Sequence, residues 1–175
     1  MHNILIVVDV QNDFVDGSLG TKEAVSIIPN VCSKIKNFEG DIYVTKDTHF
    51  DNYLNTSEGK KLPIEHCVKE RDGWQLNEYV ERALSDKEYT IIEKNSFGSF
   101  ELPDIIRQKY SNLDFQIEIV GLCTDICVVS NALILKANFP ENEIKVDASC
   151  CAGVTVESHN ASLLTMKMYL KKKQI

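Results

Sequence analysis

The chain has 175 residues, of which 43% are hydrophobic and 26% charged, and its formal net charge at pH 7 is −7. This length suits one domain with a large core, so residues 1–175 are expected to form a single domain. The acidic balance argues against nucleic acid as a partner, and no apolar stretch is long enough to span a membrane.

Strand-like and helix-like segments alternate along the chain. Runs rich in β-branched residues predict strands at 3–8, 41–45, 89–92, 117–120 and 144–146. Apolar residues at helical spacing predict helices at 23–38, 74–84, 102–110, 125–137 and 156–170, the first becoming regular near Pro29 and the last ending in the lysines at 171–173. Residues 50–74 lack periodicity and predict a long loop. The alternation predicts a three-layer α/β/α fold around a parallel sheet of about five to six strands.

The first residues already form a strand-like run, so we expect no signal peptide and a cytoplasmic protein. In a reduced compartment the six cysteines are expected to be free thiols rather than disulfides. Cys32, Cys67, Cys150 and Cys151 are interpreted as structural, and the adjacent pair Cys150 and Cys151 is expected to follow a strand.

Polar or reactive residues follow four of the predicted strands. The carboxyl ends of parallel strands meet at one edge of the sheet, where ligands bind in open α/β folds. We therefore expect these side chains to gather at that edge. They are Asp9, Asp47, His49, Lys94, Cys123 and Cys127.

Cys127 falls in the first turn of a predicted helix, where the helix dipole favours a thiolate. Lys94 would favour the thiolate by its charge, and Asp9 could take the thiol proton and return it to a leaving amine. The backbone N–H groups of Cys123 and Cys127 could converge on one oxyanion. The pattern indicates a catalytic triad of Asp9, Lys94 and Cys127; the alternatives are a structural ion pair and two buried thiols.

A second group of residues has the spacing of metal ligands. Asp47 and His49 point the same way in an extended segment and can share one ion. Glu58 and His66 can fold back from the loop to complete two nitrogen and two oxygen ligands. The set suits one divalent ion, Zn²⁺ first and Mn²⁺ or Fe²⁺ as alternatives. The alternative is a loop without an ion, and the remaining two histidines are assigned no role.

Four motifs together carry a resemblance to a known family. They are VDVQNDF at 8–14, DTH at 47–49, Lys94 within IEKNSF, and GLCTDICV at 121–128. With these motifs the chain resembles the isochorismatase-like cysteine hydrolases, and among them the nicotinamidases. The resemblance implies about six parallel strands, the last reduced to 173–175. It also implies a Cys127 thiol that attacks a carboxamide carbon, releases ammonia and leaves a thioester for water to hydrolyse.

The resemblance also implies roles for the residues around the nucleophile. The backbone of Cys123 and Cys127 would form the oxyanion hole, after a cis peptide between Leu122 and Cys123. The four ligands named above would hold an ion that binds a pyridine nitrogen, and Phe14 would lie on the ring face. Residues 62–65 lack the Trp and paired prolines of many nicotinamidases, so the opposite wall must come from elsewhere. The candidates for that wall are Phe97, Phe100, Tyr53 and Trp74.

The function implied is hydrolysis of nicotinamide, and of pyrazinamide, to the acid and ammonia in NAD salvage, by a homo-oligomer such as a dimer or tetramer. The partner would be a small carboxamide substrate. The main alternative is a metal-free amidohydrolase of the same family acting on an N-carbamoyl or ureido substrate. Two further rivals are a family member whose site has decayed into an interaction surface and an isochorismate hydrolase. The presence of all the triad and ligand residues argues against the first, and the intact Cys127 together with the metal ligands argues against the second.

Overall fold

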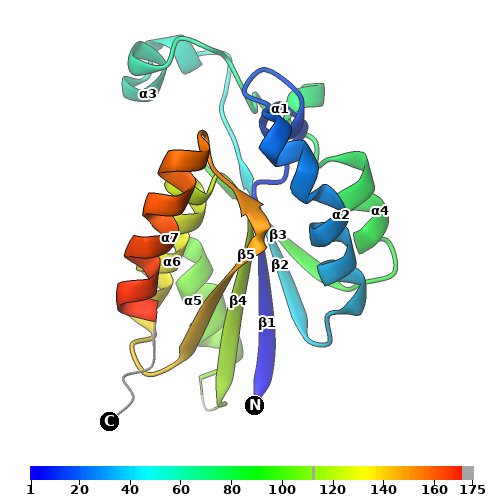
Figure 1. The fold of residues 1–175 in the computed structure, drawn as a ribbon, viewed down its shortest axis with the longest axis vertical. Coiled ribbons are helices and arrows are strands. Elements are labelled where there is room, and N and C mark those ends of the chain that lie inside the picture. Colours follow the sequence, from blue (N-terminus) through cyan, green and yellow to red (C-terminus); the bar gives the residue numbers. More distant parts are fainter. Residues whose placement is uncertain (112, 171–175) are drawn as a thin grey trace.

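The structure is a computed structural model that describes residues 1–111 and 113–170. Its five strands form one sheet in the order β3-β2-β1-β4-β5, and every neighbouring pair is parallel. The carboxyl ends of the strands therefore share one edge, at the top in Figure 1. The strands are β1 (His2–Val8), β2 (Asp41–Asp47), β3 (Tyr89–Lys94), β4 (Phe115–Leu122) and β5 (Glu143–Ala152).

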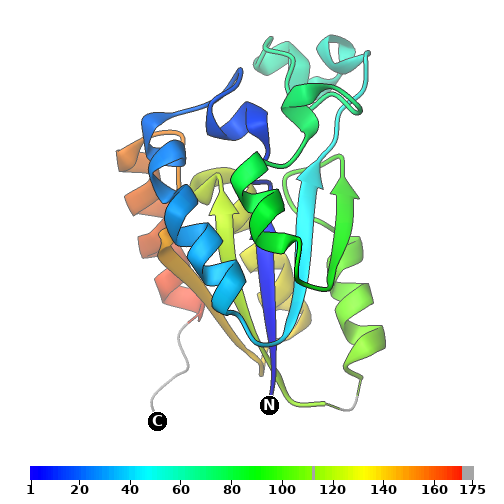
Figure 2. The ribbon, with the colours of Figure 1, turned by 90° about the vertical axis from the view of Figure 1, so that its right-hand side faces the viewer.

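Helices cover both faces of the sheet, which confirms the predicted three-layer fold (Figures 1 and 2). On one face Leu5 and Val7 of β1 pack into the same core as α2 and α4, and on the other face Ile4 and Ile6 pack toward α5, α6 and α7. A strand buried on both faces has to be continuously apolar, as this one is. These helices are α2 (Lys22–Asn37), α4 (Glu78–Leu84), α5 (Glu101–Lys109), α6 (Val129–Asn138) and α7 (Val156–Leu170).

Helix α2 runs unbroken through Pro29, whereas the sequence predicted that its regular part begins near that residue. The helix starts at Lys22 because the hydroxyl of Thr21 accepts a hydrogen bond from the amide of Ala24 at 3.0 Å. Burial of Ile27, Ile28 and Val31 against the sheet outweighs the hydrogen bond that proline cannot make.

Strand β5 is longer than predicted, so Cys150 and Cys151 lie within it rather than after it. Asp147 and Ser149 interrupt the apolar pattern at the point where the pairing with β4 shifts its register, so the strand signal in the sequence ends early. Trp74 ends a short 3₁₀ turn, Asp72–Trp74, and α4 begins only at Glu78. The predicted lysine helix end at 171–173 and the last strand at 173–175 lie outside the described residues.

The segment predicted as a long loop is folded into short elements above the carboxyl edge of the sheet (Figures 1 and 2). It contains the 3₁₀ turns Tyr53–Asn55 and Asp72–Trp74 and the helix α3 (Ser57–Lys61). The short helix α1 (Asn12–Val15) packs against the second of these turns. These elements cover the edge where the candidate site residues gather.

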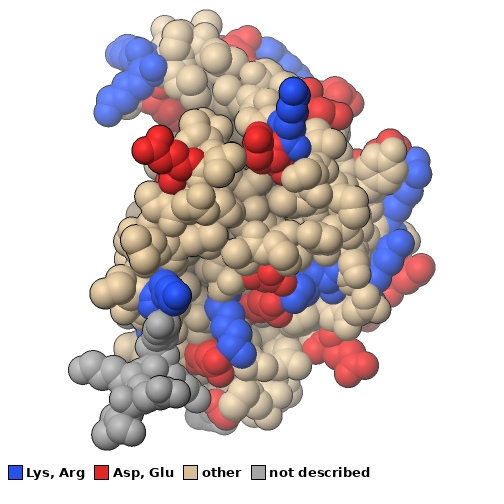
Figure 3. Space-filling model, in the orientation of Figure 1, with Lys and Arg blue, Asp and Glu red and all other residues tan. Residues whose placement is uncertain are grey.

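None of the helices in the described part of the chain is long and apolar enough to cross a membrane. In the face shown in Figure 3, acidic and basic side chains are interspersed.

Gly121 is required where β4 passes β1. Its φ is +122°, and a Cβ at this position would lie 2.1 Å from the carbonyl oxygen of Val8. We expect Gly121→Ala to lower the free energy of unfolding by about 3 kcal/mol or more, through backbone strain and overlap. Urea denaturation measures this. Gly98→Ala is the control, because the nearest atom there is the mobile Cδ1 of Ile134, and an equal loss in both variants would contradict the prediction.

Candidate active site

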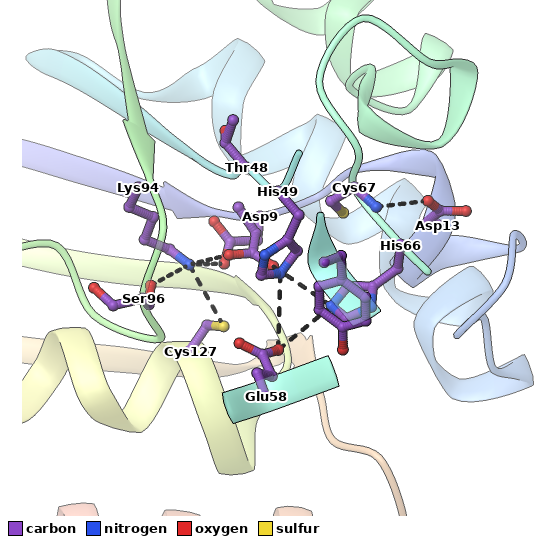
Figure 4. A network of polar contacts seen from close by, with 12 residues as sticks. Asp9, Asp13, Thr48, His49, Glu58, His66, Cys67, Lys94, Ser96 and Cys127 are labelled. Carbon is purple, nitrogen blue, oxygen red and sulfur yellow. Dashed lines mark hydrogen bonds and ion pairs between the residues drawn. The ribbon is translucent and has the colours of Figure 1, made fainter. Parts of the chain in front are cut away.

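A buried ammonium lies at the centre of the carboxyl edge. Nζ of Lys94, at the end of β3, lies 2.6 Å from Oδ2 of Asp9 and 3.6 Å from Sγ of Cys127 (Figure 4). It also lies 3.1 Å from the carbonyl oxygen of Ser96 and 3.4 Å from Oδ1 of Asp47. The three predicted triad side chains are thus brought together, and each is almost completely buried.

Asp9 directly follows β1 and has a left-handed backbone, with φ at +48°. Its amide donates to the carbonyl of Thr45 on β2 at 3.1 Å, and its own carbonyl accepts from the amide of Gln11 at 2.8 Å. The hydroxyl of Thr45 donates to Oδ1 of the carboxylate at 2.6 Å. The neighbouring strand therefore holds both the backbone and the side chain of Asp9.

Cys127 lies on a π-helical turn, Thr124–Val128, where the sequence predicted the regular start of a helix. The peptide between Leu122 and Cys123 is cis, as the resemblance implied. Single π-helical turns are frequent at functional sites. Asn131 of α6 donates to the carbonyl of Cys127 at 2.8 Å and so ties the turn to the following helix.

The charges of the triad depend on one another. Burial raises the pKa of Cys127, and the carboxylate of Asp9 raises it further, against the opposing effect of Lys94. Burial also raises the pKa of Asp9, whereas the pKa of Lys94 stays above its usual range because surrounding negative charges outweigh its burial. Burial and the Asp9 carboxylate therefore oppose the thiolate predicted for Cys127, whereas Lys94 favours it.

Four possible metal ligands lie together beside the triad. Nε2 of His49 lies 3.0 Å from Oδ2 of Asp47 and 3.7 Å from Oε1 of Glu58. Nε2 of His66 lies 3.7 Å from Oδ2 of Asp47 and 3.6 Å from Oε1 of Glu58. Glu58 is on α3, and Figure 4 shows its carboxylate facing the rings of His49 and His66, so the short helix supplies the fourth donor of the predicted set.

The donor set fits a divalent metal ion. Nδ1 of His66 donates to the carbonyl of Ile64 at 2.8 Å, which leaves the lone pair of Nε2 facing the cluster. Nε2 of His49 is buried and makes no well-aligned hydrogen bond within the described residues. Ligand atoms of Asp47, His49 and His66 all lie within 4.8 Å of one another. Two imidazoles and a carboxylate in this arrangement suit Zn²⁺, with Mn²⁺ or Fe²⁺ as alternatives.

The thiol of Cys127 and the candidate metal ligands Asp47, Glu58 and His66 line one cavity of about 420 Å³. Phe14 forms part of its wall, and Phe97 and Cys123 line it as well. Phe14 also packs against the His66 ring, with centroids 5.5 Å apart. An apolar slot thus lies between a thiol and a group of ligands, with an aromatic ring on its wall.

Phe100 does not line this cavity, contrary to its predicted role as a substrate-binding residue. It precedes the first turn of α5, 77% of its surface is exposed, and it borders a separate depression. Tyr53 is fully buried behind the two ligand imidazoles, and its hydroxyl donates to Leu62. Trp74 lies against Lys46 and donates to Thr48 outside the cavity. Of the four candidates for the second aromatic wall, Phe97 alone lines the cavity.

Some residues that build the site were given no individual role from the sequence. Thr45 and Asn131 are fully buried polar residues in segments that look like ordinary strand and helix. Gln11 accepts from the amide of Asp47 and donates to its carbonyl, so it fixes the backbone that presents the first candidate metal ligand. His159, which had no predicted role, hydrogen-bonds through Nδ1 to the hydroxyl of Thr124 at 2.8 Å. Only the folded chain reveals such partners.

Comparison with known proteins assigns the family. The isochorismatase domain family matches residues 3–172. The chain belongs to this family. This membership and the similar solved structures confirm the predicted resemblance and the expectation of a hydrolase. No curated protein matches the chain.

Several solved structures share the fold of this family member. The pyrazinamidase of Pyrococcus horikoshii in complex with zinc is 25% identical, with a TM-score of 0.78, and the match covers 97% of each chain. The nicotinamidase of Staphylococcus aureus is 26% identical, with a TM-score of 0.74, over 97% of this chain and 96% of that one. The nicotinamidase/pyrazinamidase of Bacillus subtilis is 22% identical, with a TM-score of 0.81 and 95% of each chain covered. The last likeness concerns the fold alone.

The ligand cluster predicts a measurable metal content. We expect the wild-type protein to bind one zinc ion per chain, and His66→Ala to weaken binding at least about tenfold because it removes a nitrogen ligand. Competition with a zinc-sensitive dye measures the affinity. His2→Ala is the matched control, because His2 is exposed at the far end of β1. Unchanged affinity in His66→Ala would contradict the assignment.

Proposed function

We propose that this hydrolase is a metal-containing nicotinamidase that acts on the amide C–N bond. It converts nicotinamide to nicotinate and ammonia in NAD salvage in the cytoplasm, and it accepts pyrazinamide, whose ring presents the same nitrogen and amide. One observation carries the proposal: the thiol of Cys127 and the ligands Asp47 and His66 line the same cavity. The cavity can hold a ring that contacts the ligand cluster on one side while its amide faces the thiol.

The triad residues supply the acid–base steps of the proposed reaction. Sγ of Cys127 bonds to the amide carbon while Asp9 takes the thiol proton. The oxyanion that forms faces the amides of Cys123 and Cys127. Asp9 then gives the proton to nitrogen as the C–N bond breaks and ammonia leaves. In the second half Asp9 takes a proton from the attacking water and returns it to sulfur as the C–S bond breaks. The product leaves as the carboxylic acid, which then loses its proton to solvent and becomes the carboxylate.

Lys94 keeps Asp9 ionised and offsets the negative charge that appears on sulfur. A bound Zn²⁺ would be held by Asp47, His49 and His66 with Glu58, and its contribution would be to bind the pyridine nitrogen and fix the ring. The wall residues Phe14 and Phe97 line the cavity in which that ring would lie.

The first test is ammonia release from nicotinamide. We expect the zinc-loaded wild type to hydrolyse nicotinamide and pyrazinamide, and Cys127→Ala to lose at least about 10⁴-fold in kcat because the nucleophile is gone. Cys32→Ala is the control, since Cys32 lies on α2 away from the cavity. Activity retained in Cys127→Ala would refute the triad. Turnover of an N-carbamoyl substrate without metal, with none of nicotinamide, would favour the alternative amidohydrolase.

A second prediction concerns assembly. Members of this family usually associate, and we expect a dimer or tetramer of the 19.8 kDa chain. Light scattering on the purified protein measures the particle mass. A particle with the mass of a single chain at micromolar concentration would contradict this prediction and leave the proposed chemistry untouched.

A further inference from the structure

We propose that Thr45 is a positioning residue, whose hydroxyl aims the carboxylate of Asp9 so that only Oδ2 faces the nucleophile. The inference rests on the triad of the proposed function, and it concerns a residue that does not touch the substrate.

Thr45 holds Asp9 at two points. The Asp9 amide donates to the Thr45 carbonyl at 3.1 Å, and the Thr45 hydroxyl donates to Oδ1 of Asp9 at 2.6 Å. Both residues are completely buried, so no water competes for these groups. Thr45 pairs in register with Val8, the last residue of β1, and is therefore placed beside Asp9 by the sheet itself.

Asp9 needs such a contact because Lys94 cannot orient it alone. The ammonium has three protons but four acceptors within 3.6 Å: Asp9, Asp47, Ser96 and Cys127. Although Oδ2 lies 2.6 Å from Nζ, it makes no well-aligned hydrogen bond among the described residues. The ion pair keeps the carboxylate charged, and the directional bond that fixes its plane comes from Thr45.

The two carboxylate oxygens thus have different tasks. Oδ1 is occupied by the Thr45 hydroxyl, whereas Oδ2 has lone pairs free to accept a proton. When sulfur attacks, the thiol proton moves to Oδ2 as the S–C bond forms, and the same oxygen later delivers that proton. Without the hydroxyl the carboxylate can rotate about its Cβ–Cγ bond and point away from sulfur.

The Thr45 hydroxyl can act on Asp9 in two ways, by orienting its carboxylate and by stabilising its negative charge. Loss of the first would slow proton removal from Cys127, and loss of the second would not. Burial raises the pKa of Asp9, and the hydrogen bond from Thr45 is among the contacts that oppose this rise. If the hydroxyl acted only through its electrostatic effect, its removal would make Asp9 a stronger base and would not slow proton removal from Cys127. A slower reaction therefore indicates lost orientation.

The test compares Thr45→Val, which keeps the shape but lacks the hydroxyl, with Thr45→Ser, which keeps the hydroxyl. Val44→Ala is the stability control, because Val44 is equally buried but belongs to the apolar core on one face of the sheet, whereas the hydrogen bonds to Asp9 come from Thr45. The first readout is the rate at which iodoacetamide alkylates Cys127, followed on its peptide by mass spectrometry, with iodide leaving and the thiol proton passing to Asp9. This readout does not depend on the natural substrate.

We expect Thr45→Val to slow alkylation and to lower kcat for nicotinamide by about 10²-fold, with KM within about threefold of the wild type. Thr45→Ser should recover most of the rate, and Val44→Ala should lose stability but not rate. If Thr45→Val does not fold, Thr45→Ala is compared with Thr45→Ser in the same way. Wild-type alkylation rates in Thr45→Val, or a Ser variant as slow as Val, would overturn the inference. A wild type inert toward nicotinamide would refute the proposed substrate but leave the alkylation result decisive.

Discussion

The site depends on one buried ammonium. Lys94 has been taken out of water, and its charge is tolerable only because Asp9, Asp47 and the sulfur of Cys127 surround it. Each of these partners comes from a different strand end or turn, so the charge network requires the sheet order to be as it is. The same network connects the candidate triad to the candidate metal ligands, since Asp47 faces Lys94 with one oxygen and His49 with the other.

Much of this arrangement could be predicted from the sequence. Polar residues directly after continuous apolar runs identified Asp9, Asp47 and Lys94, because parallel strands deliver their carboxyl ends to one edge. The predicted bounds of helices and strands were wrong where the local sequence signals were weak or contradictory. Strand β5 contains a polar stretch and a register shift, and the proline in α2 suggested a later start than tertiary burial enforces.

Residues that act through hydrogen bonds were harder to find. Thr45 is an ordinary strand former, and nothing in its neighbourhood along the chain distinguishes it from a structural β-branched residue. Phe100 illustrates the opposite error, since this aromatic residue is near the site in sequence but is mostly exposed at the start of α5. Nearness along the sequence does not determine the direction in which a side chain points. For Thr45 and for Phe100, that direction decides whether the side chain reaches the site.

Helix α3 has a consequence for the enzyme as a whole. It has five residues, too few to be stable alone, yet it supplies Glu58 and part of the cavity wall. Its order therefore depends on the Thr56 cap and on what Glu58 binds. An ion bound by Glu58 would hold α3 more firmly over the cavity, and α3 held there would in turn retain the ion. The affinity for the cation and the access of substrate to the cavity would therefore be thermodynamically linked.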